Sequence, residues 1–417
     1  MTSSVAPRLS GADSAAALRR ALTHSGRREQ LRAAALVLPL FLFLLATFIV
    51  PIGAMLGRAF FDREVAEIMP RVTSELARWD GRALPPDAAY SALIEDVRAA
   101  REAGTLASAA TRLNYDVAGF RTLLFATGRR LGGEVAGSPR EILGAIDPKW
   151  NDLETWAVIR RAAAPVTDFY LLAALDLRRD ANGSITATQP EQAVFRNVLG
   201  RTLWISGVVT FVCLLLGYPV AYFIARQPPG RAAVLLFLVL LPFWTSLLVR
   251  TVAWVVLLQR EGILNNLFLS LGLVNEPVRM IFNRFAVYVA MVHVLLPFMV
   301  LPVYAVMKGI SPSHLRAASS LGAAPFTAFR RVYVPQTLPG VGAGCLMVFI
   351  QALGYYITPA LVGGADDQMI SYFIAFYASK TVNWGMAAAL SIMLLAATLA
   401  LYAVYDRMVG IDQMRLG

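Results

Sequence analysis

The sequence contains few of the residues that hold metals or form covalent crosslinks, with two cysteines and three histidines among 417 residues. Cys213 and Cys345 both lie inside apolar runs, where a free cysteine is typically a small core residue. No cluster of histidine and cysteine has the spacing of a zinc site. We therefore expect no cofactor and no metal in this chain.

Charged residues are also scarce, at 16% of the chain, whereas hydrophobic residues make up 57%. This balance is too apolar for an ordinary soluble protein and is typical of a membrane protein. The formal net charge of +11 does not indicate a nucleic-acid partner, because most basic residues flank apolar runs. The positive-inside rule explains basic residues in such places.

The chain lacks the groups that usually supply energy for transport. Its three lysines, Lys149, Lys308 and Lys380, are nowhere preceded by glycine, so there is no Walker A loop. No carboxylate lies within the long apolar runs, although ion-coupled carriers commonly place acids there. We expect no enzymatic activity and a separate ATPase, and the alternative is an ion-coupled secondary transporter that acts without one.

Six apolar runs are long enough to cross a hydrocarbon core of about 30 Å at about 1.5 Å per residue. The first transmembrane helix is predicted over residues 33–59. The others are predicted over 202–225, 232–258, 285–307, 341–362 and 386–405. The predicted fold class is an all-α integral membrane protein with six transmembrane helices.

Basic residues fix the predicted orientation. Residues 1–32, the turn 226–231, the loop 308–331 and Arg407 carry them on one face, which the positive-inside rule places in the cytoplasm. Residues 1–32 and 408–417 are therefore predicted to be cytoplasmic tails, with the five-helix core spanning 198–407.

A long polar segment, residues 60–197, separates the first two predicted spans. Residues 88–113 and 154–177 show apolar residues at helical spacing among charged ones. The segment contains no histidine and no cysteine. We predict a helical extracytoplasmic insertion that serves in packing or docking.

The polar segment 309–341 interrupts two apolar runs and carries helix punctuation. Ser311 followed by Pro312 has the form of an N-cap with proline at the first helical position, and Gly322 supplies a left-handed stop. Pro325 can begin a second short helix, which Pro335 and Pro339 are expected to end. Two capped helices indicate a docking surface for another protein more than a simple loop between two spans.

Polar residues inside the spans are candidates for a translocation path, although each alone is more often a contact between helices. On a straight third span, Arg250 lies about 28 Å beyond Arg231. Snorkelling to the outer interface beside Trp254 and a substrate-gating role are the two interpretations of Arg250. The candidate set is Thr245, Ser246, Arg250, Gln351, Tyr355 and Tyr356.

Segment 309–341 resembles the EAA loop of importer-type ABC permeases, and the likeness is closest to the spermidine/putrescine-type branch. Positions that match the family pattern are Ala317, Ala318, Leu321, Gly322, Phe329, Pro335 and Pro339. Arg316 stands where the family usually has an acid. The runs at 241–254, 295–304 and 354–364 resemble the same branch.

The resemblance implies a permease subunit in the bacterial cytoplasmic (inner) membrane that imports polyamines, or a related small solute, by alternating access. It implies two ATPase subunits that bind ATP and Mg, a second homologous permease, an extracytoplasmic substrate-binding protein and surrounding membrane lipid. Contact with the ATPase is expected at Ser313, Leu315, Arg316, Ala317, Ala318, Leu321, Gly322, Phe329 and Pro335.

Overall fold

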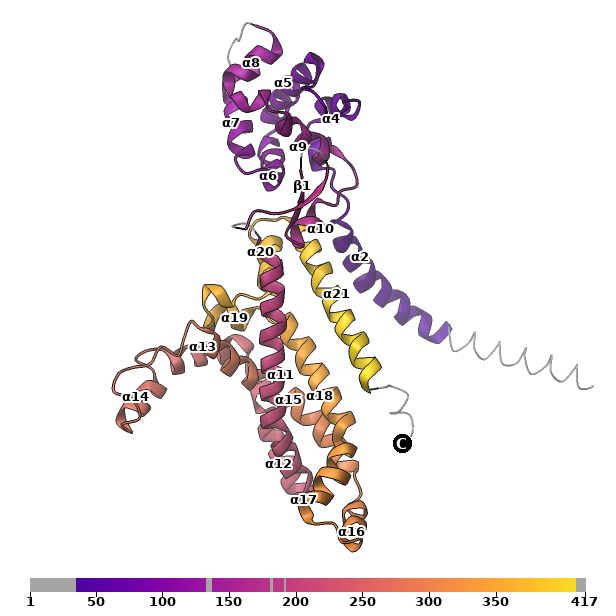
Figure 1. Ribbon diagram of the computed structural model, residues 1–417, viewed down its shortest axis with the longest axis vertical. Helices are drawn as coiled ribbons and strands as arrows, with labels where there is room; N and C mark the ends of the chain where they lie inside the picture. The colour runs from indigo at the N-terminus through magenta and orange to yellow at the C-terminus, as the bar shows by residue number, and fades with distance from the viewer. Residues whose placement is uncertain (1–34, 133–136, 181–182, 191–192, 410–417) are drawn as a thin grey trace, which may run out of the picture. The chain divides into compact units, whose positions relative to one another are not determined.

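The computed structural model describes residues 35–132, 137–180, 183–190 and 193–409 (Figure 1). Internal contacts divide the chain into residues 1–57 and residues 58–417. The predicted tails, 1–32 and nearly all of 408–417, lie outside the described residues. The all-α fold class is confirmed, because helices account for nearly all regular structure in the described part of the chain.

The first unit contains one apolar helix of 23 residues, Ala35–Gly57, with no buried residue along its most apolar stretch. It includes a π-helical turn η1 (Leu45–Ile49) followed by α2 (Val50–Gly57). The helix lacks charged residues and is long enough to span a bilayer. It matches the first predicted span over residues 35–57, whereas residues 58 and 59 form a turn after the helix and residues 33 and 34 lie outside the described residues.

The second unit begins with a small helical domain, which we call the insertion. Its α-helices are only 5 to 16 residues long. Glycine, proline and aspartate between them favour turns and end the helices early. Its elements are α3 (Glu64–Ile68), α4 (Pro70–Ala77), α5 (Asp87–Glu102), α6 (Leu106–Asp116), α7 (Phe120–Arg130), α8 (Pro139–Ile146), η2 (Pro148–Asn151), α9 (Leu153–Ala163), α10 (Phe169–Ala174) and an antiparallel hairpin of β1 (Leu177–Arg179) and β2 (Ile185–Ala187).

Aromatic side chains form the centre of the insertion. Trp150 and Trp156 are fully buried, and the rings of Tyr90 and Trp156 lie 4.5 Å apart between centroids. Their polar atoms are bonded: the Trp156 indole N–H donates to the Trp150 carbonyl (2.9 Å) and the Trp150 indole N–H donates to Thr127 Oγ1 (3.0 Å). Such large, satisfied aromatic groups contribute much of the apolar burial of a small domain.

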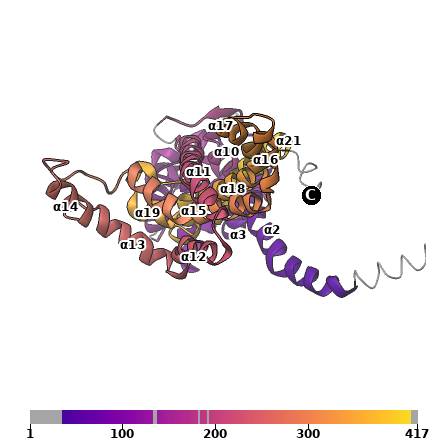
Figure 2. The same ribbon diagram turned by 90° about the horizontal axis from the view of Figure 1, so that it is seen from below.

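Three long helices form the centre of the membrane part. α11, α15 and α18 pack against one another, and Figure 2 shows the three helices side by side. α13 and α14 extend to one side of them. The elements of this part are α11 (Phe195–Ala225), α12 (Pro229–Leu240), η3 (Leu241–Trp244), α13 (Leu247–Leu258), α14 (Ile263–Ser270), α15 (Arg284–Gly309), α16 (Pro312–Ser320), α17 (Pro325–Ala328), η4 (Phe329–Tyr333), α18 (Val334–Gly354), α19 (Ile357–Val362), η5 (Ala365–Asp367), α20 (Ile370–Ser379) and α21 (Trp384–Val409).

The third predicted span is wrong as a single straight helix. The chain bends by 92° between residues 229–244 and 247–270. Pro242 lies in the 3-10 turn before the bend and Thr245 leaves helical geometry with ψ of 148°. Proline lacks the N–H that a continuous helix needs, so the chain breaks there. The described residues thus hold five spanning helices, or six if the bent pair is one span.

The fifth span also differs from its prediction. One helical stretch covers Pro325–Gly354, so neither Pro335 nor Pro339 ends it. Pro335 falls in the first turn of α18, where an N–H is not required, and the π-helical turn η4 resets the hydrogen-bonding pattern just before it. The helix instead ends at Gly354, and α19 is a separate short helix.

The insertion is fastened to the start of two spans. Asp176 accepts hydrogen bonds from the backbone N–H groups of Phe195 (2.9 Å) and Arg196 (2.8 Å), which begin α11. The ring of Tyr170 lies against Gly385 in the first turn of α21, where an added Cβ would be only 2.4 Å from the ring. Only glycine permits this close approach between the insertion and α21.

We expect Trp156→Ala to destabilise the insertion by about 3–5 kcal/mol, because it removes a fully buried indole and leaves a cavity. Limited proteolysis of the purified full chain should then cut within residues 60–197 at lower temperature than in the wild type. Trp244→Ala is the matched control, since that side chain is 79% exposed. Equal effects of both substitutions would contradict the assigned core.

Candidate functional site

The helix α16 is capped at its start as the sequence predicts. Ser311 accepts a hydrogen bond through Oγ from the Ser313 N–H (3.3 Å), and Pro312 occupies the first turn. The helix has no buried residue. A short exposed helix needs such local support, because it gains little from burial.

The end of α16 is a left-handed turn at Gly322, which has a φ of +84°. The N–H groups of Gly322 and Ala323 donate to the carbonyls of Ser319 (3.0 Å) and Ala318 (3.1 Å), which would otherwise lack partners. An added side chain would meet open space at Gly322, so the backbone conformation alone requires glycine. The predicted cap and stop are both confirmed.

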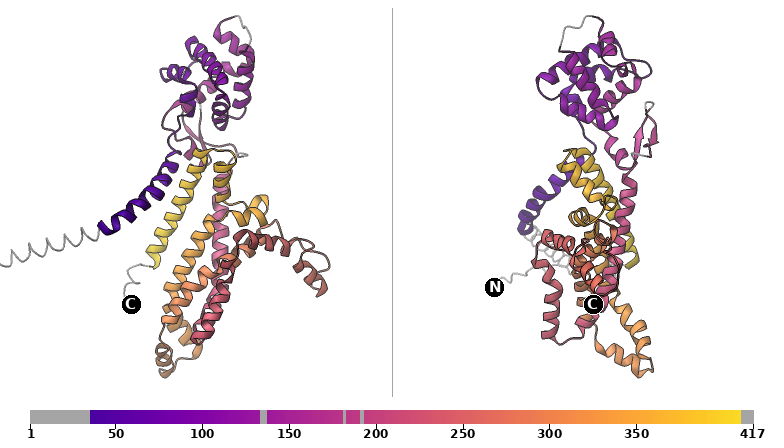
Figure 3. Two further views of the ribbon diagram at one scale, coloured as in Figure 1. Left: turned by 180° about the vertical axis from the view of Figure 1, so that it is seen from behind. Right: turned by 90° about the vertical axis from the view of Figure 1, so that its left-hand side faces the viewer.

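Aromatic rings tie the α16–α17 segment to the end of α11. The ring of Tyr222 lies 5.4 Å from Phe329 and 5.5 Å from Tyr333, and the Arg226 guanidinium lies 4.0 Å above the Tyr222 ring. This cluster is at the end of α11 that is remote from the insertion (Figure 3). It fixes the segment to the spans through several ring contacts.

A hydrogen bond also joins α16 directly to α18. His314 Nδ1 lies 2.7 Å from Gln336 Oε1, and Gln336 Nε2 donates to the Val332 carbonyl (2.7 Å). The imidazole therefore acts as the donor to the amide oxygen. Sequence reasoning missed His314 and Gln336, which lie on opposite sides of the predicted loop and are brought together only by the turn.

The residues predicted to contact an ATPase differ in how exposed they are and in which helix they lie. Leu315, Ala318 and Phe329 are half-buried, with Leu315 and Phe329 packed against the membrane core. Pro335 is exposed but lies in α18, outside the short helices. The remaining predicted residues are exposed together on α16 and its turn: Ser313, Arg316, Ala317, Leu321 and Gly322. Their role stays a prediction.

Two large apolar side chains protrude from the turn between α16 and α17. Leu321 is 89% exposed and Phe326 is 72% exposed. Exposed apolar groups on a basic segment are typical of a protein interface. Phe326 was not among the predicted contact residues, although an aromatic residue between two prolines in a polar loop could have indicated it.

The bend in the third span brings Arg250 among residues of two other helices. Its charge acts on His293 of α15 and on Tyr355, which follows α18. The Nε and Nη1 atoms of Arg250 are buried and have no hydrogen-bond partner among the described residues. The count that supported snorkelling assumed a straight helix, which the bend removes, and both interpretations of Arg250 stay predictions.

A hydrogen bond fixes the neighbour of Arg250. The Trp254 indole N–H donates to His293 Nδ1 (3.2 Å), so Nδ1 of this imidazole carries no proton. A second bond links Thr251 Oγ1 to Thr358 Oγ1 (3.2 Å), which joins α13 to α19. These contacts hold the broken helix against the other spans.

The other predicted path residues are less closely associated. Thr245 and Ser246 are exposed at the bend, where Thr245 Oγ1 donates to the Pro242 carbonyl (2.9 Å). Gln351 and Tyr356 are also exposed. Among the predicted set, the structure brings together only Arg250 and Tyr355, and their part in translocation stays a prediction.

A further ion pair lies where α11, α15 and η5 meet. Arg284 Nε bonds Asp367 Oδ1 (2.9 Å), and Asp367 is only 6% exposed. The Arg201 guanidinium donates to the carbonyls of Asp366 and Gln368. Sequence reasoning missed this contact, because Arg201 and Gln368 are 167 residues apart.

The segment that contains both sites matches a known family. Residues 215–411 match the family described as binding-protein-dependent transport system inner membrane component. The spermidine/putrescine transport system permease protein PotB of Haemophilus influenzae is 38% identical over 214 residues, which cover 51% of this chain and 75% of that protein. The chain belongs to this family. It is thus an importer-type ABC permease and a multi-pass inner-membrane protein.

A second PotB protein agrees with this assignment. The PotB protein of Escherichia coli is 37% identical over 214 residues, covering 51% of this permease and 78% of that protein. A chain from a solved bacterial alginate ABC transporter is 19% identical with a TM-score of 0.43, covering 52% of this permease and 78% of that chain. The family match begins within α11, so the insertion lies outside it.

We expect Gly322→Val to abolish uptake and Gly322→Asn to preserve most of it. Asparagine adopts a positive φ far more readily than a β-branched residue, so only valine should distort the turn after α16. Uptake into proteoliposomes by the assembled transporter measures the effect, with membrane insertion of each variant as the control. Full uptake by the valine variant would contradict a role for this turn.

Proposed function

We propose that this permease imports a small cationic solute of the polyamine class by alternating access driven by partner ATPase subunits. The α16 helix is the contact with the ATPase. The single observation that supports this is a capped, exposed helix joined to the spans at several points. A rigid connection of this kind transmits movement, whereas a flexible loop would absorb it.

The energy source follows from what the spans contain. In the described spanning helices, carboxylates are lacking except for Asp406 near the end of α21. A carrier driven by protons or sodium ions usually needs such groups within the membrane. The proposed assembly therefore has two ATPase subunits that bind ATP and Mg, a second homologous permease and an extracytoplasmic substrate-binding protein.

The proposed solute class rests on the relatives. Two of them are spermidine/putrescine transport system permease proteins that are 38% and 37% identical to this chain. The proposed orientation places both termini in the cytoplasm and the insertion outside, so that the insertion faces the binding protein. This orientation follows the basic flanks, since arginines accumulate on the cytoplasmic side of spans.

The competing function is an ion-coupled carrier that acts without an ATPase. The two differ in what copurifies with the chain and in what drives uptake. Gentle-detergent purification of the tagged chain is expected to recover an ATPase and a second permease. Putrescine uptake into proteoliposomes is expected to require ATP. Uptake by the purified chain alone, driven by an ion gradient, would refute the ABC assembly.

We expect Arg316→Glu to weaken recovery of the ATPase about tenfold, because Arg316 is exposed on α16 and its partner surface should carry compensating acids. Arg279→Glu is the matched control, since that residue precedes α15 at its other end. Quantitative copurification from detergent measures the effect. Tighter association of the glutamate variant would show that the partner surface is instead basic.

A further inference from the structure

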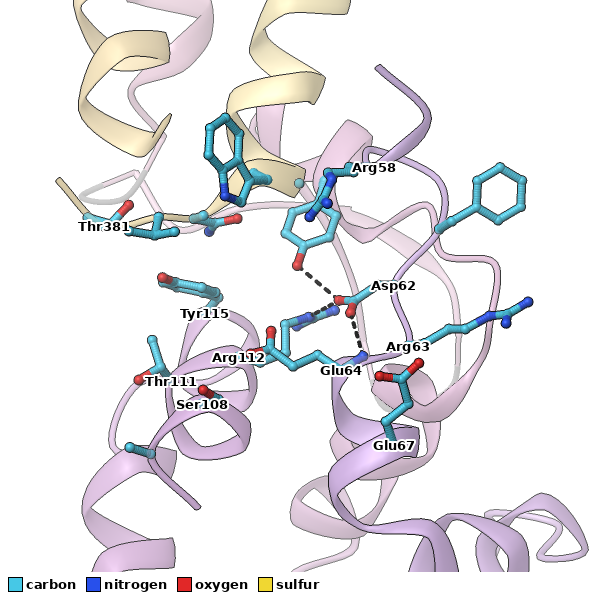
Figure 4. Close-up of a pocket in the computed structure, with 17 residues that line it drawn as sticks. Arg58, Asp62, Arg63, Glu64, Glu67, Ser108, Thr111, Arg112, Tyr115 and Thr381 are labelled. Atoms are coloured by element: carbon cyan, nitrogen blue, oxygen red, sulfur yellow. Dashed lines mark hydrogen bonds and ion pairs between the residues drawn. The ribbon is translucent and has the colours of Figure 1, made fainter. Parts of the chain in front are cut away.

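A cavity of about 750 Å³ lies between the insertion and the start of α21 (Figure 4). Its lining comes from the segment that leads into α3, from α6 and α10, and from the turn between α20 and α21. Carboxylates, hydroxyls and aromatic rings all contribute to it. A volume of this size is sufficient for a small organic ligand.

The base of the cavity is a buried ion pair. The Arg112 Nε atom bonds Asp62 Oδ2, and Arg112 is only 1% exposed. Asp62 also accepts from the Tyr170 hydroxyl (2.9 Å) and from the Glu64 backbone N–H (3.1 Å). Burial raises the pKa of Tyr170, so its hydroxyl stays protonated and remains a donor. Asp62 and Arg112 thus pair their charges with each other within the protein.

The same pair leaves one hydrogen-bond donor unused. Arg112 Nη1 is buried and has no partner among the described residues. The guanidinium is held in place by the rings of Phe169 and Tyr170, whose centroids lie 4.7 and 5.0 Å from its central carbon. A buried donor without an acceptor is costly, and it marks this end of the cavity as polar.

Glu64 and Glu67 remain as the carboxylates of the cavity that are free of ion pairs. Neither has a basic group within 4 Å among the described residues. In Figure 4 the Glu64 side chain extends toward Tyr115, whereas Arg63 points away from the cavity. Arg58 also lines it.

The surroundings of Glu64 favour a positive partner. Desolvation, then the charge of Asp62, raises the pKa of Glu64, and Arg112 and Ser108 only partly oppose this. A cation placed beside Glu64 would be stabilised by a charge that the protein leaves unpaired.

Aromatic rings form the walls above the carboxylates. Tyr115 and Trp384 both line the cavity, and Trp384 is 39% exposed although it is a large apolar side chain. Desolvation and then the charge of Glu64 raise the pKa of Tyr115, so its ring stays neutral. Neutral aromatic faces attract ammonium groups, and tryptophan does so best.

We propose that this cavity binds the ammonium group of a small organic amine, with Glu64 as its counter-ion and Tyr115 and Trp384 as its aromatic walls. The site lies in the insertion and at the α21 start, away from Arg250 and from α16. The proposal rests on the proposed function in one respect, since a permease that imports a cationic solute would meet amines on the side of the insertion.

The test is titration of the purified full chain in lipid nanodiscs with putrescine, by isothermal calorimetry and without ATPase or binding protein. Saturable binding is expected for the wild type. Glu64→Gln should weaken it about tenfold, because it removes one charge-assisted contact. Glu102→Gln is the matched control, since that carboxylate is exposed and remote from the cavity, and its affinity should be unchanged.

The aromatic wall has its own pair of variants. Trp384→Ala is expected to weaken binding about fivefold and Trp384→Phe to restore most of it, as an ammonium on an aromatic face requires. Thermal unfolding of each variant verifies that the insertion is still folded. Absence of saturable putrescine binding, or equal affinity of the wild type and Glu64→Gln, would overturn the proposal.

The outcome is separable from that of the transport proposal. Binding that depends on Glu64 in a chain without ATP-driven uptake would support this site and contradict the proposed function. ATP-driven uptake with no such binding would support the proposed function and contradict this site. Equal competition by sodium ions at the same ionic strength would show a nonspecific surface charge effect and would also overturn the amine site.

Discussion

Inside a lipid bilayer, every backbone N–H and C=O group must find its partner within the protein, and the membrane part of this chain depends on that constraint. Long helices satisfy it along α11, α15 and α18. Where helices break, local bonds replace the lost ones: Thr245 donates twice to the Pro242 carbonyl, and Tyr355 N donates to Ala352 O (3.1 Å). Each of the two helix breaks, at Thr245 and at Tyr355, therefore keeps its backbone groups hydrogen-bonded within the chain.

Two polar parts are attached to this core in different ways. The α16–α17 segment is held by edge-to-face aromatic contacts of Tyr222 and by the bond between His314 and Gln336. The insertion is held by the Asp176 carboxylate, which caps the start of α11, and by the close contact of Tyr170 with Gly385. Both attachments are made at helix ends, so movement of a span would carry its attached part with it.

Local features were predicted well because their causes are local. The cap at Ser311 and the turn at Gly322 depend on side chains and φ angles within a few residues, and the structure has both. The end of the second span at Ala225 and most of the sixth span agree with their predicted bounds. The helical character of segments 88–113 and 154–177 follows from apolar spacing, and α5, α6, α9 and α10 occupy them.

The errors in the predicted spans arose at prolines, because a proline can either break a helix or lie in its first turn. Proline breaks the chain after Pro242, yet Pro335 lies inside a continuous helical stretch because it falls in a first turn. Composition does not predict these outcomes, because Pro242 stands in an apolar run and breaks the helix, whereas Pro335 stands in the polar segment 309–341 and does not. The straight-helix distance from Arg231 to Arg250 fails for the same reason, because it depends on the direction that α13 takes after the bend.

The sequence by itself determined the class of the protein, the number and approximate places of its apolar helices, and the capped segment that marks the family. These follow from composition, hydrophobic length and local turn chemistry, which need no partner from distant parts of the chain. Only the tertiary structure decided which polar groups meet. The ion pairs of Asp62 with Arg112 and of Arg284 with Asp367 join residues 50 or more positions apart, and the packing of helices alone brings them together.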